Sequence, residues 1–137
     1  MKTFEEFKRE YTEDGAVFRD DTFDKYYEYF RDHAQVGDGA TVCFYTDRHA
    51  CTIIKRTAKT LTLRQCKATL KPDFKPEFDI GGFCAHCTNQ NKQDYDYEEN
   101  PDGTIYTARW SKKKKRFIAD KHLRVIAGRR EFYDYNF

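Results

Sequence analysis

The sequence lacks the features that mark membrane and exported proteins. No apolar run approaches the roughly 18 residues that span a bilayer, and the polar, acidic N-terminus does not resemble a secretory signal. We therefore expect a soluble cytoplasmic protein that does not associate with membranes. The five cysteines are odd in number, and we expect them to remain thiols in that compartment.

Signatures of catalysis are also missing. There is no glycine-rich phosphate loop, no nucleophile-elbow serine and no pair of histidines at zinc-protease spacing. Asp94 and Asp96 lie two apart on a predicted strand, which is compatible with a carboxylate pair for acid/base or metal chemistry. The alternation of acidic and tyrosine side chains is more typical of a half-buried strand with a solvated face. The sequence thus predicts a protein that is not an enzyme and needs no cofactor.

Methionine and leucine are scarce, so aromatic residues must supply the core. The chain has one Met but 12 Phe and 10 Tyr, and its aromatic share of 17% predicts a folded chain. A length of 137 residues predicts a single domain.

The net charge of +2 hides an asymmetry. Residues 1–38 carry 6 basic and 11 acidic side chains, a balance of −5, whereas residues 39–137 carry 19 and 12, a balance of +7. We interpret this as an acidic N-terminal extension beside a basic body. The basic body favours a phosphate-bearing or acidic partner, and the acidic segment can equally dock on it within the chain.

Helical spacing of aromatic residues predicts two short helices, over residues 2–11 and 22–33. Thr3 with Glu6 forms a capping-box pattern, Gly15 is expected to end the first helix, and Asp21 or Thr22 to cap the second. A glycine-rich turn at residues 37–39 then marks the change to β-structure.

The remaining chain predicts β-strands, and the fold class is α+β, mainly β. An antiparallel meander of SH3-like curvature is expected, with the aromatic helices as its lid. Residues 70–82 are expected to be irregular because Pro72 and Pro76 interrupt β-ladders. An added C-terminal hairpin and strand complete the sheet. The expected strands are 40–45, 50–56 and 60–66 in the meander, a hairpin of 94–98 with 104–110, short strands 116–119 and 123–126, and a final strand 128–137.

Residues 83–87 form a compact cluster in which Cys84 and Cys87 enclose His86. They supply two or three zinc ligands, but a closed site needs four and no second pair matches. A redox role needs the first cysteine at a helix N-terminus, which lowers its pKa, whereas these residues are predicted to form a loop. Packing or ligand contact is the favoured interpretation, with zinc binding as the alternative.

The residue inventory favours recognition of an anionic nucleotide. Such a ligand needs arginine for phosphate, an aromatic face for the base, and amide or imidazole groups for the ribose. The strand that ends at Arg109 and Trp110 has a hairpin partner just beyond the loop 83–91, so loop and strand are expected to meet. The lysines at 112–115 are interpreted as a soluble hairpin tip. The candidate ligand-binding residues are Phe83, His86, Asn89, Asn91, Arg109, Trp110, Arg124 and Arg129.

Four blocks of sequence resemble a family of small bacteriophage proteins. The blocks are GDGAT at 37–41, YTDRHACTII at 45–54, GGFCAHCTNQ at 81–90 and EFYDYNF at 131–137. The chain is similar from residue 37 onward to anti-Thoeris sponge proteins, which sequester cyclic ADP-ribose-type immune signals. The resemblance implies anti-defence activity by nucleotide binding in a homo-oligomer, with the pocket where protomers meet.

Within that resemblance, individual positions acquire roles. Phe83 is expected to stack on the base, Asn91 to supply an amide and Arg109 to hold phosphate. Arg124 or Arg129 would suit a separate site for cyclic oligonucleotides. The alternative from the residues themselves is an SH3-like module that binds nucleic acid or an acidic protein surface. A zinc-stabilised interaction domain is a third hypothesis.

Overall fold

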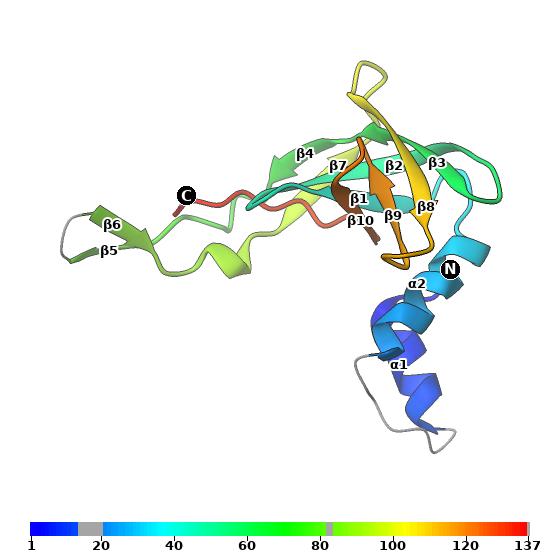
Figure 1. The fold of residues 1–137 in the computed structure, drawn as a ribbon. Coiled ribbons are helices and arrows are strands. Elements are labelled where there is room, and N and C mark those ends of the chain that lie inside the picture. Colours follow the sequence, from blue (N-terminus) through cyan, green and yellow to red (C-terminus); the bar gives the residue numbers. More distant parts are fainter. Residues whose placement is uncertain (14–20, 82–83, 137) are drawn as a thin grey trace.

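A computed structural model describes residues 1–13, 21–81 and 84–136. In these residues two α-helices precede a closed antiparallel barrel, from which an arm of paired strands extends (Figure 1). The α+β, mainly β class is therefore confirmed. The barrel strands are β1 (Gly39–Cys43), β2 (Arg48–Arg56), β3 (Thr60–Gln65), β8 (Ile105–Ser111), β9 (Arg116–Ala119) and β10 (Leu123–Ala127).

Around the barrel the strand order is β1-β10-β9-β8-β3-β2. The predicted meander forms β1, β2 and β3, and β10 closes the barrel by pairing with β1. Alternate residues point inward, as a closed barrel requires. Its fully buried interior side chains include Val42, Ile53, Leu61, Leu63, Phe117 and Val125.

Helix α2 (Asp21–His33) closes one end of the barrel. The fully buried Phe30 packs edge-on against Phe117, with ring centroids 5.9 Å apart. Arg116 of β9 donates to Asp24 at 2.9 Å, and its guanidinium lies 3.9 Å from the centre of the Tyr27 ring. The expected aromatic lid is thus present, and an acidic helix does dock on the basic sheet.

Helix α1 (Phe4–Glu13) packs on α2 through aromatic contacts, including Phe4 stacked on Phe23 at 4.7 Å, and contributes no buried residue. The predicted cap is present, since the Glu6 N–H donates to Thr3 Oγ1 at 3.2 Å. Gly15 lies outside the described residues. Of the helices described, none is long and apolar enough to cross a membrane.

The arm begins where β3 continues into β4 (Lys67–Leu70), which pairs with β7 (Tyr95–Glu98). The predicted hairpin of 94–98 with 104–110 is wrong. Both β7 and β8 run along the same long strand, β4 followed by β3, because that strand offers each of them a partner. The turn-forming residues 99–104 make an outward loop between them instead. Gly103 sits so close to Gln65 that an added Cβ would lie 2.1 Å from its carbonyl oxygen.

At the far end of the arm, β5 (Phe78–Gly81) pairs with β6 (Cys84–Cys87) (Figure 1). The loop assignment of residues 84–87 and the irregular assignment of 78–81 are therefore wrong, because these segments satisfy their backbone groups by pairing with each other. A 3₁₀ turn, η1 (Gln90–Lys92), leads from β6 back toward β7.

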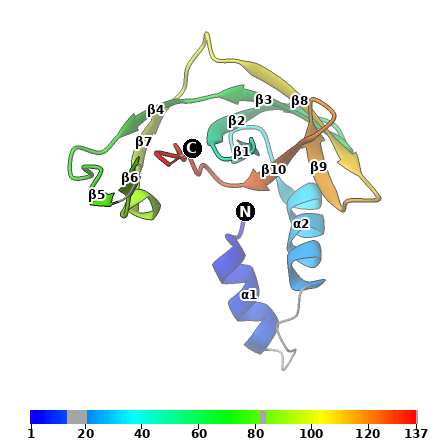
Figure 2. The same cartoon turned by 60° about the vertical axis from the view of Figure 1, so that its left-hand side comes forward.

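The predicted final strand over 128–137 is also wrong, since most backbone N–H groups of residues 130–136 donate to side chains and not to a neighbouring strand. In the described part of this segment a single β-bridge joins Phe132 to Arg48. Arm side chains bind two further backbone groups: Gln93 accepts from the Tyr133 N–H at 3.1 Å, and Gln90 accepts from the Tyr135 N–H at 2.9 Å. Residues 129–136, here called the C-terminal strap, run from the barrel to the arm (Figure 2).

Candidate functional site

The candidate site is a row of side chains across the outer face of the barrel. Residues directly opposite each other in a β-ladder project on the same face. The register places Arg109 opposite Ile118, Ile118 opposite Arg124, Arg124 opposite Cys43, and Cys43 opposite Arg48. The barrel thus aligns three arginines that are far apart in sequence, with Ile118 between Arg109 and Arg124 and with Cys43 between Arg124 and Arg48.

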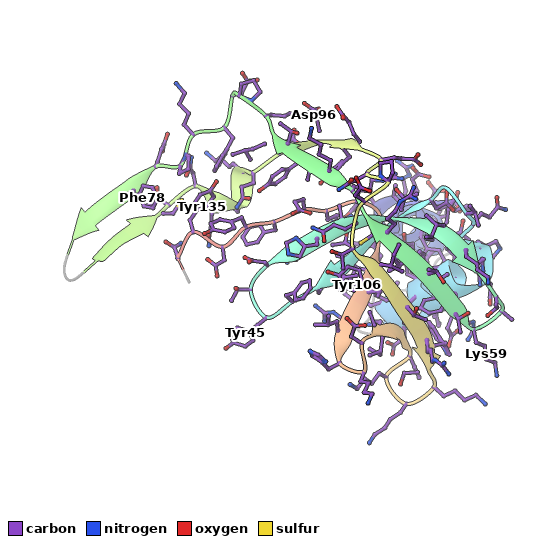
Figure 3. All side chains as sticks on the ribbon, turned by 90° about the horizontal axis from the view of Figure 1, so that it is seen from above. Tyr45, Lys59, Phe78, Asp96, Tyr106 and Tyr135 are labelled. Atoms are coloured by element: carbon purple, nitrogen blue, oxygen red, sulfur yellow. The ribbon has the colours of Figure 1, made fainter. Side chains whose placement is uncertain are left out.

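This row borders an open hollow of about 750 Å³. Tyr45 stands beside it, 91% exposed, and Figure 3 shows its side chain projecting from the β1–β2 connection. The hollow combines aromatic, imidazole and cationic groups. Its lining residues are Cys43, Phe44, Tyr45, Lys114, Arg116, Ile118, His122, Leu123 and Arg124.

A second hollow of about 550 Å³ adjoins the first and shares Lys114 and Ile118 with it. It contains Arg109 and Trp110. Two of the predicted ligand-binding arginines, Arg109 and Arg124, therefore face neighbouring parts of one basic surface.

The arginines of this surface differ in whether other side chains of the protein already bind them. Arg116 is held by Asp24 and Tyr27, as described above. Across residues 1–13, 21–81 and 84–136, no acidic side chain forms an ion pair with Arg109 or Arg124. The charges of these two arginines are accordingly available to a ligand.

Cys43 lies between Arg124 and Arg48 in the row. Burial raises the pKa of its thiol, and the opposing effect of the two guanidinium groups does not reverse that shift. A thiol that stays protonated is a poor nucleophile. Cys43 therefore suits packing and weak hydrogen bonding, and the arrangement supports binding more than covalent chemistry.

Trp110 is less open to a ligand than its position at a strand end suggests. Its ring packs against Phe117 at 5.2 Å, and the Arg31 guanidinium lies 4.8 Å from its centroid. The half-buried indole thus forms a wall between core and hollow.

The predicted loop residues lie elsewhere. Asn89 and Asn91 are in the arm, which Figures 1 and 2 show well apart from β8, so the expected meeting of loop and strand does not occur within one chain. The Asn89 amide is committed to the arm: its oxygen accepts from the Glu77 N–H at 2.8 Å, and its nitrogen donates to the Lys75 carbonyl at 2.9 Å. Phe83 lies outside the described residues, as does the side chain of His86.

Arg129 has a structural role. Its guanidinium donates to the Gly37 carbonyl at 3.2 Å and to Thr52 Oγ1 at 3.0 Å, and so ties the chain after β10 to the turn before β1 and to β2. Because both bonds occupy its guanidinium, Arg129 is less suited than Arg109 or Arg124 to bind phosphate.

Cys87 is buried, and its backbone N–H donates to Asn136 Oδ1 at 2.6 Å. Among the side chains that the structure describes, no group of three or more His, Cys, Asp or Glu is placed to hold a metal ion.

Sequence reasoning missed Tyr45, Lys114, His122 and the alignment of Arg48 with Arg124. Each of these positions can be recognised only once β1 is known to pair with β10, a contact between opposite ends of the β region. Comparison with known proteins adds no further assignment: no family model, no curated protein and no solved structure matches this chain.

Proposed function

We propose that the protein binds a small anionic, nucleotide-like ligand in the basic hollow and releases it chemically unchanged. The observation that carries this proposal is the row of Arg109, Arg124 and Arg48 across adjoining strands, with Tyr45 exposed beside it. Arginine forks suit phosphate oxygens, and an exposed tyrosine offers a stacking face for a base.

The resemblance to phage anti-Thoeris sponges gives the ligand a class, a cyclic ADP-ribose isomer, and gives binding a purpose, sequestration of a host immune signal. Sequestration needs no catalytic group, in keeping with the lack of catalytic motifs in the sequence. Asn91 lies in the arm, so it reaches such a ligand only if a second copy of the chain supplies it. The proposal therefore includes a homo-oligomer.

Titration calorimetry with cyclic ADP-ribose isomers tests the site. We expect Arg124→Glu and Tyr45→Ala each to weaken binding at least about tenfold, since each removes a direct contact of roughly 1.4 kcal/mol or more. Lys67→Glu is the matched control, because it reverses an exposed charge on β4, away from the hollow. Unchanged heats for both hollow variants would contradict the site assignment.

The fate of the ligand tests sequestration separately. A complex that is heat-denatured should return the ligand intact, as judged by mass spectrometry. Recovery of fragments would show an enzyme instead.

A second candidate is binding of single-stranded nucleic acid, favoured by the extension of the row over five neighbouring strands, with Lys114 and Lys121 beside it. Salt separates the two functions. Logarithmic affinity for a single strand falls with logarithmic salt by about 0.7 per neutralised phosphate, so several contacts give a steep slope. A nucleotide held by one or two phosphate contacts gives a shallow one.

A further inference from the structure

Phe132 of the C-terminal strap extends the basic row by one position. The Arg48 N–H donates to the Phe132 carbonyl at 2.9 Å, and the Phe132 N–H donates back to the Arg48 carbonyl at 3.1 Å. This bridge sets the two residues opposite each other, just as Arg48 is opposite Cys43. The Arg48 guanidinium lies 5.6 Å from the centroid of the Phe132 ring.

The neighbouring residue of the strap fixes this register. Glu131 accepts from the Ala50 N–H at 2.7 Å and bonds to His49 Nδ1 at 3.1 Å. Residues 131–132 are thus attached to residues 48–50 by four hydrogen bonds, two through the backbone pair and two through the Glu131 carboxylate. Phe132 cannot slide along β2 while these bonds persist.

An exposed arginine on a flexible stem loses rotamer freedom when it grips an anion. An aromatic ring that already holds the guanidinium removes part of that loss before the ligand arrives. Within the row, Arg48 is the arginine that has such a ring beside it from the strap.

We infer that Phe132 is a positioning residue of the anion site, acting through Arg48, so that the C-terminal strap is a component of the site. This inference rests on the proposed function. The inference adds to that function a residue that contacts no ligand, and it requires that the strap be docked on β2.

The test is a double-mutant cycle in affinity for cyclic ADP-ribose at fixed ionic strength, with wild type, Phe132→Leu, Arg48→Gln and the double variant. We expect about a three- to tenfold loss for each single variant, the range of an exposed cation–π contact and its pre-organisation. The double variant should lose no more than Arg48→Gln alone. Phe132→Tyr, which keeps the ring, should retain affinity.

Tyr133→Leu is the matched control, because it truncates the next aromatic residue of the strap, which is 55% exposed and leaves the four anchoring bonds in place. Additive losses in the cycle, or an unchanged affinity of Phe132→Leu while Arg124→Glu abolishes binding, would overturn the inference alone. If Arg124→Glu binds as well as wild type, the proposed function fails instead. If Phe132→Leu does not fold, Arg48→Lys replaces it in the test, because lysine keeps the charge but not the planar guanidinium. Full affinity of Arg48→Lys for cyclic ADP-ribose would refute positioning of the guanidinium by the Phe132 ring.

Discussion

The arginines of this protein share one chemistry but have different partners. Arg56 donates to the carbonyls of Ala34 and Arg31, the latter at 2.7 Å, and so satisfies the C-terminal end of α2. Arg129 ties strand ends together, and Arg116 holds the acidic helix. Arg109 and Arg124 remain for a ligand. Residue type alone marked Arg109, Arg124 and Arg129 as candidates, and only the partners of each side chain separate the structural Arg129 from the other two.

His49 gives a prediction on pH. Its hydrogen bond to Glu131 raises the pKa of the imidazole above the ordinary value of 6.5, so the pair stabilises the fold fully below about pH 6.5. That contribution is lost as pH rises through the raised pKa. We expect His49→Gln to lower the unfolding free energy by about 0.5–1 kcal/mol near pH 6, and by less near pH 8.5. Urea denaturation at both pH values measures the difference.

Glu131→Gln serves as the partner variant, and the double variant should show no more pH dependence than either single one. An equal loss at both pH values would mean that His49 contributes through packing alone.

At the scale of elements, the loop between β7 and β8 depends on close approach at Gly103. Because an added Cβ would lie 2.1 Å from a backbone oxygen of β3, Gly103→Ala must push the loop away from the long strand. We expect a loss of about 1–3 kcal/mol in unfolding free energy. Asp102→Ala, in the exposed part of the same turn, should cost far less in the same urea titration. Equal stability of the two variants would contradict this account.

Local pattern was enough to predict most elements but not all of their partners. The aromatic stripes predicted both helices, and short connectors predicted the meander β1–β3, because these signals act within a few residues. The turn residues 100–103 predicted a hairpin, but the same sequence is equally compatible with an outward loop. What decided between them is the length of the β3–β4 strand opposite, which lies 30 or more residues away in the chain.

For the whole molecule, the change of charge at Gly39 directed the search for binding residues to the β body, where Arg109 and Arg124 share a surface. The amide-rich segment around Asn89 did not join them, because the arm carries it away from the barrel. Composition counts the groups that suit a ligand, whereas barrel closure decides which of them converge. Tyr45 and Arg48 enter the site through that closure.

Barrel, strap and arm should also differ in how they open. The barrel has a buried core, whereas the strap is joined to the arm through polar side chains, notably Gln93, which accepts from the Tyr133 N–H and donates to its carbonyl at 2.6 Å. Regions held by a few polar contacts open locally, and this opening costs less free energy than global unfolding. We expect Gln93→Leu to speed hydrogen exchange at Tyr133 about 3- to 10-fold, the range of one net hydrogen bond.

Exchange at the core residues Ile53, Leu61 and Leu63 should stay unchanged in that variant, because their burial does not involve the strap. Lys92→Ala, an exposed neighbour of Gln93, is the control and should leave Tyr133 protected. Faster exchange in both barrel and strap would show that they unfold together. If they open separately, ligand binding should slow exchange in the strap, since Phe132 then connects the anion site to a segment that is otherwise free to detach.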